Sequence, residues 1–118
     1  MDKEEFLKIL NDNIKDFNKK VKFIFISHSS RIECHLTSIG NTENVAYISN
    51  YTSPRLDEAN RHLIHDLIDK LINFSGRTIS FFIFLNKSRN IQKGFHFISN
   101  KITVNETDNF IEIILNEE

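Results

Sequence analysis

The sequence predicts a single α+β domain that covers residues 1–118, with elements in the order α-β-β-β-α-β-β-β. A length of 118 residues suits one hydrophobic core. Apolar residues recur every three or four positions in two segments, which predicts helices, and alternate in shorter segments, which predicts strands. Short links between the strand segments favour antiparallel neighbours. We therefore expect one largely antiparallel sheet with two helices packed on it.

The first predicted helix runs from about Lys3 to Asn18. Asp2, followed three residues later by Glu5, has the form of a capping box, in which the first side chain accepts a hydrogen bond from the start of the helix. The apolar side chains share one face, so the helix packs through one side only. They are Phe6, Ile9, Leu10, Ile14 and Phe17.

Three strands are predicted between the helices. In the second of them, Ile32, Cys34 and Leu36 point inward and alternate with side chains that face water. His35 and Thr37 belong to the water-facing set. The predicted strands cover residues 21–26, 31–39 and 45–51, with turns at 27–30 and 40–44.

The second predicted helix begins at Ser53-Pro54 and ends near Gly76. Serine is a good N-cap, proline suits the first helical position, and glycine is a common helix stop. The apolar residues form a set wider than one stripe, so we expect this helix to have neighbours on more than one side. The set comprises Leu56, Ala59, Leu63, Ile64, Leu67, Ile68, Leu71, Ile72 and Phe74.

Three more strands follow, at residues 78–85, 95–104 and 110–115, and the middle one is allowed a bend or a split. The two halves therefore share an element order. The segment Phe23–Arg31 also resembles Phe82–Arg89. That match is short and mostly hydrophobic, so we interpret it as chance composition and not as an internal repeat.

Composition and charge exclude several classes of function. The chain has 15 basic and 16 acidic side chains, a formal net charge of -1, so a nucleic-acid partner, which needs a basic face, is not expected. One cysteine excludes an internal disulfide and a cysteine-rich zinc site. No apolar run has the length of a secretion signal or of a membrane span, so we expect a cytoplasmic protein without a membrane partner.

No cofactor-binding motif is present in the sequence. Gly40, Gly76 and Gly94 are isolated, so neither a P-loop nor a dinucleotide fingerprint can form, and no cofactor is expected. Cys34 and His35 point to opposite faces of one strand and cannot form a nucleophile–base pair. Cys34 is therefore expected to be a buried, inert thiol.

The second predicted helix carries the best candidate for a metal site. His62 and His65 share a side, with Asp66 and Asp69 on the same flank, and imidazole and carboxylate groups can together bind zinc. These residues lie on the water-facing side, and their spacing differs from the His-Glu-x-x-His motif of metalloproteases. We interpret them as a solvated helix face and predict no metal ligand and no catalytic residue.

The leading functional hypothesis is a non-enzymatic, cytosolic protein-binding domain. A short single domain without catalytic motifs suits an immunity protein or inhibitor, which masks the site of a toxin, effector or enzyme. Acidic side chains suit a basic target, because complementary charge speeds encounter. The residues predicted to contact the partner are Asp57, Glu58, His62, His65, Asp66 and Asp69.

Two alternatives stay open. The order α-β-β-β-α-β-β and the segment Leu67–Asn73 are similar to the type III secretion chaperones and their leucine-rich helix, over about Phe6 to Ile98. This resemblance implies a homodimer. The chain has the strand-like segment 110–115 where that family closes with a helix, so no site is transferred. The other alternative is a small metal-dependent or histidine-based enzyme, built on His28, His62, His65 or Cys34.

Overall fold

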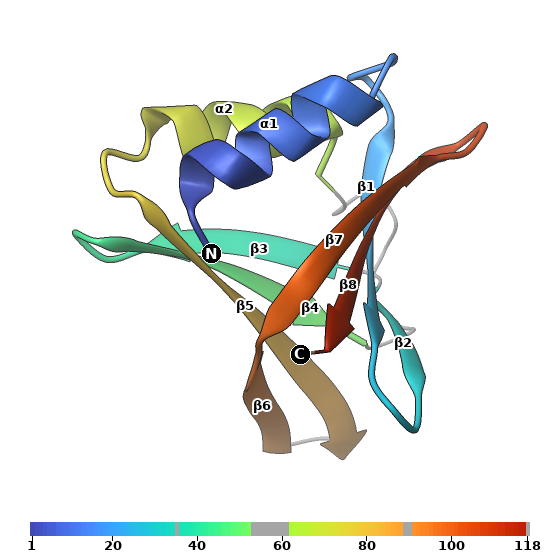
Figure 1. Cartoon of the computed structure of the whole chain (residues 1–118). Helices are drawn as coiled ribbons and strands as arrows, with labels where there is room; N and C mark the ends of the chain where they lie inside the picture. Colours follow the sequence, from blue (N-terminus) through green and yellow to red (C-terminus); the bar gives the residue numbers. More distant parts are fainter. Residues whose placement is uncertain (35, 53–61, 89–90, 118) are drawn as a thin grey trace.

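Two four-stranded sheets face each other, and both helices pack against the space between them (Figure 1). The structure is a computed structural model, and it describes residues 1–34, 36–52, 62–88 and 91–117. One cluster of buried side chains joins both helices and both sheets. The chain therefore forms a single α+β domain, as the sequence predicts.

The described chain has four strands after each helix, in the order α-β-β-β-β-α-β-β-β-β. The predicted order, with three strands after each helix, is wrong because two predicted strands are each divided in two. The helices are α1 (Lys3–Asn13) and α2 (Ile64–Asn73). The strands are β1 (Lys20–Ile26), β2 (Arg31–Cys34), β3 (Leu36–Asn41), β4 (Val45–Tyr51), β5 (Thr78–Ser88), β6 (Ile91–Phe97), β7 (Ser99–Glu106) and β8 (Phe110–Glu117).

Both sheets are mixed. Sheet A has the strand order β3-β4-β5-β6, and sheet B has the order β2-β1-β8-β7. Strands that follow each other within a sheet pair antiparallel, as the short links predict. However, β1 pairs with β8 in parallel, and so does β4 with β5. The prediction of one largely antiparallel sheet is therefore wrong, because parallel contacts join strands far apart in the chain, where local patterns carry no signal.

The two divided strands pass from one sheet to the other. β2 ends at Cys34 in sheet B, and β3 begins at Leu36 in sheet A. In the same way β6 ends at Phe97 and β7 begins at Ser99, which confirms the split allowed in the segment 95–104. Such a crossing changes which alternate side chains face the core. Thr37 is consequently 5% exposed, and the prediction that it faces water is wrong.

The first helix begins as predicted and ends early. The Asp2 carboxylate accepts a hydrogen bond from the backbone N–H of Glu5 at 3.1 Å, which confirms the N-cap. α1 ends at Asn13 and not at Asn18, because Ile14 is already extended, with φ -118° and ψ 135°. Ile14 still packs into the core from this extended segment, which explains why the apolar pattern continues past the helix.

The second helix is also shorter than predicted. α2 begins at Ile64, after the extended N-cap Leu63, so this helix does not begin at Ser53. Residues 53–61 themselves lie outside the described part of the chain. The C-cap is Phe74, and Gly76 has no positive φ, so the prediction that Gly76 stops the helix is wrong. None of the described helices is long and apolar enough to cross a membrane.

Close packing explains Gly76. A Cβ atom at this position would lie 2.7 Å from the carbonyl oxygen of Asn44 and would overlap the ring of Phe74. Any larger residue would push the β3–β4 turn away from the end of α2. Glycine therefore permits a close approach here, and no left-handed turn is involved.

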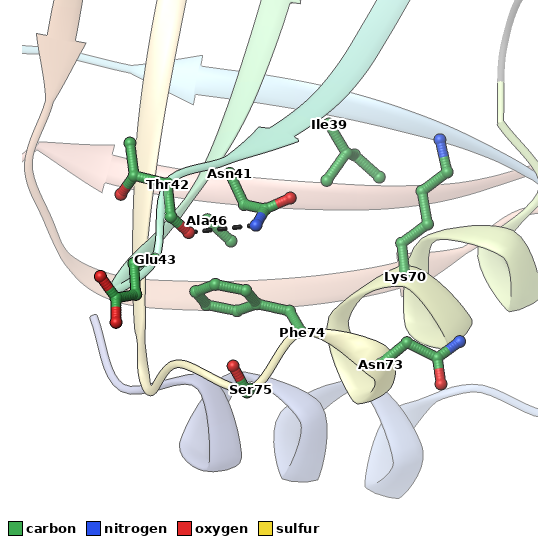
Figure 2. A pocket seen from close by; sticks show the side chains of 9 residues that line it. All are labelled: Ile39, Asn41, Thr42, Glu43, Ala46, Lys70, Asn73, Phe74 and Ser75. Carbon is green, nitrogen blue, oxygen red and sulfur yellow. Dashed lines mark hydrogen bonds between the residues drawn. The ribbon is translucent and has the colours of Figure 1, made fainter.

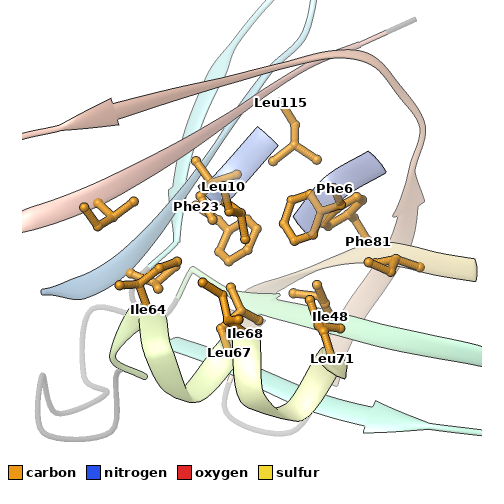
Figure 3. Close-up of a cluster of buried hydrophobic side chains, with 14 of the residues drawn as sticks. Phe6, Leu10, Phe23, Ile48, Ile64, Leu67, Ile68, Leu71, Phe81 and Leu115 are labelled. Carbon is orange, nitrogen blue, oxygen red and sulfur yellow. The ribbon is translucent and has the colours of Figure 1, made fainter. Parts of the chain in front are cut away.

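The core lies between the sheets and the two helices (Figure 3). Phe6 and Leu10 of α1 and Leu67 and Leu71 of α2 are each 0% exposed. The ring of Phe6 packs edge-on against Phe81 of β5, with 5.6 Å between the ring centroids. Helix and sheet residues thus interlock in one cluster, and burial of each large side chain stabilises the fold by about 1.5–3 kcal/mol.

The two halves of the chain repeat one topology. In the described part of the chain, each half has a helix and four strands, α1 to β4 and α2 to β8. Exchanging β1 with β5, β2 with β6, β3 with β7 and β4 with β8 converts the order of sheet B into that of sheet A. The exchange also preserves each antiparallel and each parallel pair.

Each helix is entered from a short extended segment that pairs with the first strand of the other half. Asp2, before α1, forms an antiparallel bridge with Thr78 of β5. Leu63, before α2, forms the equivalent bridge with Lys20 of β1. Each half therefore pairs with the other half in the same way. The repeated backbone hydrogen bonds are Val21 N–H to His62 O (2.9 Å), Ile79 N–H to Met1 O (2.8 Å), Ile64 N–H to Lys19 O (2.9 Å) and Lys3 N–H to Arg77 O (2.7 Å).

The turns between β3 and β4 and between β7 and β8 also repeat. The N–H of Thr42 donates to the carbonyl of Val45 at 2.9 Å, and the N–H of Thr107 donates to the carbonyl of Phe110 at 2.8 Å. In each turn the threonine hydroxyl accepts the N–H of the same later residue. The turn sequences Thr-Glu-Asn-Val and Thr-Asp-Asn-Phe are the clearest trace of this repeat in the sequence.

The structure corrects the phase of the sequence match between the halves. The repeated hydrogen bonds give Val21 and Ile79 equivalent places, so Phe23 corresponds to Phe81. The sequence alignment, which matches Phe23 with Phe82, is one residue out of phase and would move every inward side chain to the outer face. The halves repeat in topology, while that particular match does not follow the repeat.

Candidate interaction surface

Four of the six residues predicted to contact a partner are described, and they lie just before α2 and in its first six residues. Asp57 and Glu58 lie outside the described residues. The Nδ1 atom of His65 lies 3.3 Å from Oδ1 of Asp66, and both side chains are about half exposed. The four described residues, His62, His65, Asp66 and Asp69, belong to one short stretch, of which Asp69 is exposed to solvent.

The environment of His62 is only partly acidic. Burial lowers the pKa of His62 from its ordinary value, and the nearby Lys70 ammonium lowers this pKa further. Asp66 and a backbone hydrogen bond with Thr37 act in the opposite direction. A cation therefore lies beside the acidic groups, and this flank of α2 is less suited to a uniformly basic target than the sequence suggests.

The candidates for catalysis do not meet within the described ranges. No group of three His, Cys, Asp or Glu side chains there could hold a metal ion. His28 is exposed in the turn between β1 and β2, whereas Cys34 is 2% exposed and faces the core. Burial raises the pKa of the Cys34 thiol to about 12, so the thiol stays protonated at neutral pH. The predicted burial of Cys34 is confirmed.

The outer face of sheet A carries a group of aromatic rings, partly buried except for the exposed His96, which we call the aromatic face. Inward side chains such as Ile48 and Phe81 are buried, and the alternate residues of the same strands point away from the core. Both helices pack against the core cluster, on the opposite side of sheet A from these outward residues (Figure 1). The aromatic face consists of Tyr47, Tyr51, Phe82, Phe84 and His96.

The rings of the aromatic face contact one another across the strands. Tyr51 and Phe84 are stacked, with 5.1 Å between centroids and 16° between ring planes. Phe82 stacks on His96 at 5.1 Å and 22°, and Tyr47 lies 5.7 Å from Phe82. Ring faces are therefore turned toward one another, as cross-strand aromatic pairs in sheets usually are. Ring edges are left for contact with a partner.

Gly94 leaves space for one of these rings. It pairs with Phe84 across β5 and β6, and a Cβ atom at Gly94 would overlap the Phe84 ring. The Phe84 ring therefore packs directly on the backbone of β6 at Gly94. The aromatic face is thus built by backbone packing as well as by ring stacking.

The outer face of sheet B has the same topology, and it carries charged side chains beside apolar ones such as Ile24 and Ile114. Lys22 and Glu33 form an ion pair at 3.3 Å, and Glu112 accepts a hydrogen bond from Asn105 at 2.9 Å. In sheet A the equivalent positions of Lys22, Glu33 and Glu112 hold Ser80, His96 and Tyr47, according to the strand registers. Among the described side chains of the aromatic face and its neighbours on the outer side of sheet A, none is Lys, Arg, Asp or Glu.

This surface was not predicted from the sequence. The alternation within β4 was the signal that could have found it, because Tyr47 and Tyr51 alternate with the buried Ala46, Ile48 and Asn50. In β5 both alternate sets are apolar, so periodicity alone could not separate the outer Phe82 and Phe84 from the core. The pairing of β4 with β5 brings the two sets of rings together.

Comparison with known proteins assigns no family: no protein-family model, no curated protein and no solved structure matches this chain. The resemblance to the type III secretion chaperones depends on three strands after the first helix, and the structure has four. The element order therefore gives that resemblance no support.

Proposed function

We propose that this protein is a non-catalytic protein-binding domain, and that the aromatic face of sheet A is its binding surface. The observation that carries the proposal is the contrast between the two outer faces. At three matched positions sheet B holds Lys22, Glu33 and Glu112, whereas sheet A holds Ser80, His96 and Tyr47. Sheet A adds the rings of Tyr51, Phe82 and Phe84 and no Lys, Arg, Asp or Glu among its described outer side chains. Contiguous apolar surface without charge is typical of interaction sites.

A protein fits this surface better than a nucleic acid or a sugar. Nucleobases and sugar rings stack on free aromatic faces, and here Tyr51 and Phe84 cover one face of each other, as do Phe82 and His96. A nucleic acid also needs cations, and the described outer side chains of sheet A include no Lys or Arg. Aliphatic and aromatic side chains of a protein partner can pack against ring edges.

An inhibitor or immunity protein is the class that we propose. Such a protein acts by covering a functional surface of another protein. It needs a complementary, partly apolar binding surface and no catalytic residues. The aromatic face supports this role better than the flank of α2. On that flank His65 lies 3.3 Å from the Asp66 carboxylate, and the Lys70 cation lies close to His62, so the acidic groups are partly offset. The α2 residues His62, His65, Asp66 and Asp69 remain a second, weaker prediction for the contact.

Site-specific photo-crosslinking in native lysate tests the proposal. A benzoylphenylalanine at His96 lies on the aromatic face, and the same group at Glu33 occupies the equivalent place on sheet B. We expect His96→benzoylphenylalanine to capture a defined protein that Glu33→benzoylphenylalanine does not capture. Adding Tyr47→Ser should abolish capture, whereas Glu112→Ser, at the matched position of sheet B, should leave it unchanged.

Thermal melts of each variant separate loss of binding from loss of folding. Equal capture from both positions, or capture that survives Tyr47→Ser in a folded protein, would contradict the proposal. A crosslink that joins two copies of this chain would support the homodimer alternative in place of an inhibitor.

A further inference from the structure

A pocket lies between the end of α2 and the β3–β4 hairpin, away from the aromatic face (Figure 2). Its volume is about 480 Å³, within the range of small-ligand sites. Ile39, Ala46 and Phe74 form an apolar floor, in which Ala46 and Phe74 are mostly buried, at 1% and 8% exposure. Glu43 and Lys70 lie at opposite ends of this floor. The pocket therefore combines an apolar base with one negative and one positive end.

The equivalent seam of the other half is filled. Ile111 occupies the place that corresponds to Ala46, because the turns Thr42–Val45 and Thr107–Phe110 match. Ile14 corresponds to Ser75, since both lie equally far from the N-caps Asp2 and Leu63. Ile111 and Ile14 are 0% and 6% exposed, so they are packed into the structure. Two smaller residues in the second half leave the pocket open.

An ion pair also closes the seam in the first half. The Glu106 carboxylate accepts the backbone N–H of Lys15 at 2.8 Å and pairs with the Lys19 ammonium at 2.9 Å. These two contacts, the backbone hydrogen bond first, hold the pKa of Glu106 below its ordinary value. The corresponding residue of the second half is Asn41, whose side chain donates a hydrogen bond within its own turn, to the Thr42 carbonyl at 3.0 Å. The first half thus has side chains and an ion pair at the place where the second half has the pocket.

The charged groups at the two ends of the pocket are available. Within the described residues, no hydrogen bond or ion pair joins the Lys70 ammonium or the Glu43 carboxylate to another group. A cavity of 480 Å³ is about 10 Å across if it is compact. The free termini of an extended dipeptide lie about 7 Å apart, at about 3.3–3.6 Å per residue. A dipeptide is therefore short enough for the pocket and carries one charge of each sign, as the two ends of the pocket do.

We propose that this pocket binds a short zwitterionic peptide. The peptide carboxylate pairs with the ammonium of Lys70, and the peptide ammonium pairs with the carboxylate of Glu43. An apolar side chain of the peptide rests on the ring of Phe74. The site is independent of the aromatic face and of any protein partner bound there.

Titration of the ¹⁵N-labelled full chain with the dipeptide Leu-Leu, followed by NMR, tests the proposal. We expect saturable shifts at about millimolar concentration, centred on the amides of residues 41–43 and 73–75. N-acetyl-Leu-Leu and Leu-Leu-amide, each without one terminal charge, should bind about three- to fivefold more weakly, as expected for the loss of one exposed ion pair. Glu43→Gln should remove the penalty of acetylation, and Lys70→Gln should remove the penalty of amidation.

Variants that copy residues of the other half provide the controls. Ser75→Ile and Ala46→Ile introduce the residues that fill the equivalent seam, and each should abolish binding; Ser75 is exposed, so its variant is expected to fold. Asp108→Asn, at the place equivalent to Glu43, should leave binding unchanged. Equal affinity for the free and the blocked peptides, binding that survives Ser75→Ile, or no saturable shift would overturn the proposal.

Discussion

Asn50 and Thr37 form a buried polar pair in the inner layer of sheet A. The hydroxyl of Thr37 donates to Oδ1 of Asn50 at 2.9 Å, and the amide of Asn50 donates to the carbonyls of Ile48 and Phe82. In the other half the equivalent residues are Ile102 and Leu115, by the strand registers. The fold therefore accepts an apolar pair at this place.

We predict that Asn50→Leu alone lowers the free energy of unfolding by about 1–3 kcal/mol, because it leaves a buried hydroxyl without its acceptor. The double variant Asn50→Leu with Thr37→Ile should recover most of this loss, since both polar groups are then gone. Urea unfolding of the two single variants and the double variant measures the coupling. Additive losses would show that the pair is not coupled.

We predict that His62 makes the stability of the fold depend on pH near neutrality. Burial, more than the charge of Lys70, holds the pKa of His62 below its ordinary value, so the unfolded chain takes up this proton more readily than the folded chain. The stabilisation is therefore complete above the ordinary histidine range and is lost as the pH falls through it. Urea midpoints should fall between about pH 7.5 and 5.5. His62→Gln should flatten this part of the profile, and an unchanged profile would contradict the assignment.

At the scale of the elements, α1 and α2 each bury a leucine at the same position along the helix. Leu10 and Leu71 lie equally far from their N-caps and are both 0% exposed. We predict that Leu10→Ala and Leu71→Ala each cost about 2–5 kcal/mol, the range for a large buried side chain. Ile72→Ala, on the exposed side of α2 at 59% exposure, should change stability by less than about 0.5 kcal/mol. Chemical unfolding of the three variants checks the order.

Local chemistry predicted the elements whose signals are local. The cap at Asp2, the turn at residues 27–30 and the bounds of β4 all follow from side chains within a few positions. The start of α2 did not, because Leu63 belongs to an extended bridge with Lys20, a contact between distant parts of the chain. The two crossings between sheets were missed for a related reason: a strand that bends keeps its apolar residues and changes only its phase, as Thr37 shows.

The candidate surface was harder to predict than the fold. A phenylalanine in a strand indicates the core by default, and only the pairing of β4 with β5 reveals that Phe82 and Phe84 share the outer face with two tyrosines. The contacts proposed on α2 came from charge alone, and the structure adds Lys70 beside His62, which the helical spacing did not weigh.

At the scale of the whole molecule, the repeated topology makes the order of the halves exchangeable. We predict that a circular permutant folds when it begins at His62, continues through Glu118, a linker as long as residues 52–62, and Met1, and ends at Thr52. The contacts of both halves stay the same, so its melting temperature should lie within about 5 °C of the parent. A permutant opened between Phe81 and Phe82, inside a core strand, should not fold, and circular dichroism distinguishes the two.

The bridges from Asp2 to Thr78 and from Leu63 to Lys20 also limit what either half can do alone. Each sheet contains two strands from each half of the chain. We therefore expect the two halves, produced separately, to assemble one to one, and neither half to fold by itself. In concentrated solution, intact chains are expected to exchange halves and form a domain-swapped dimer, which uses the same contacts as the monomer.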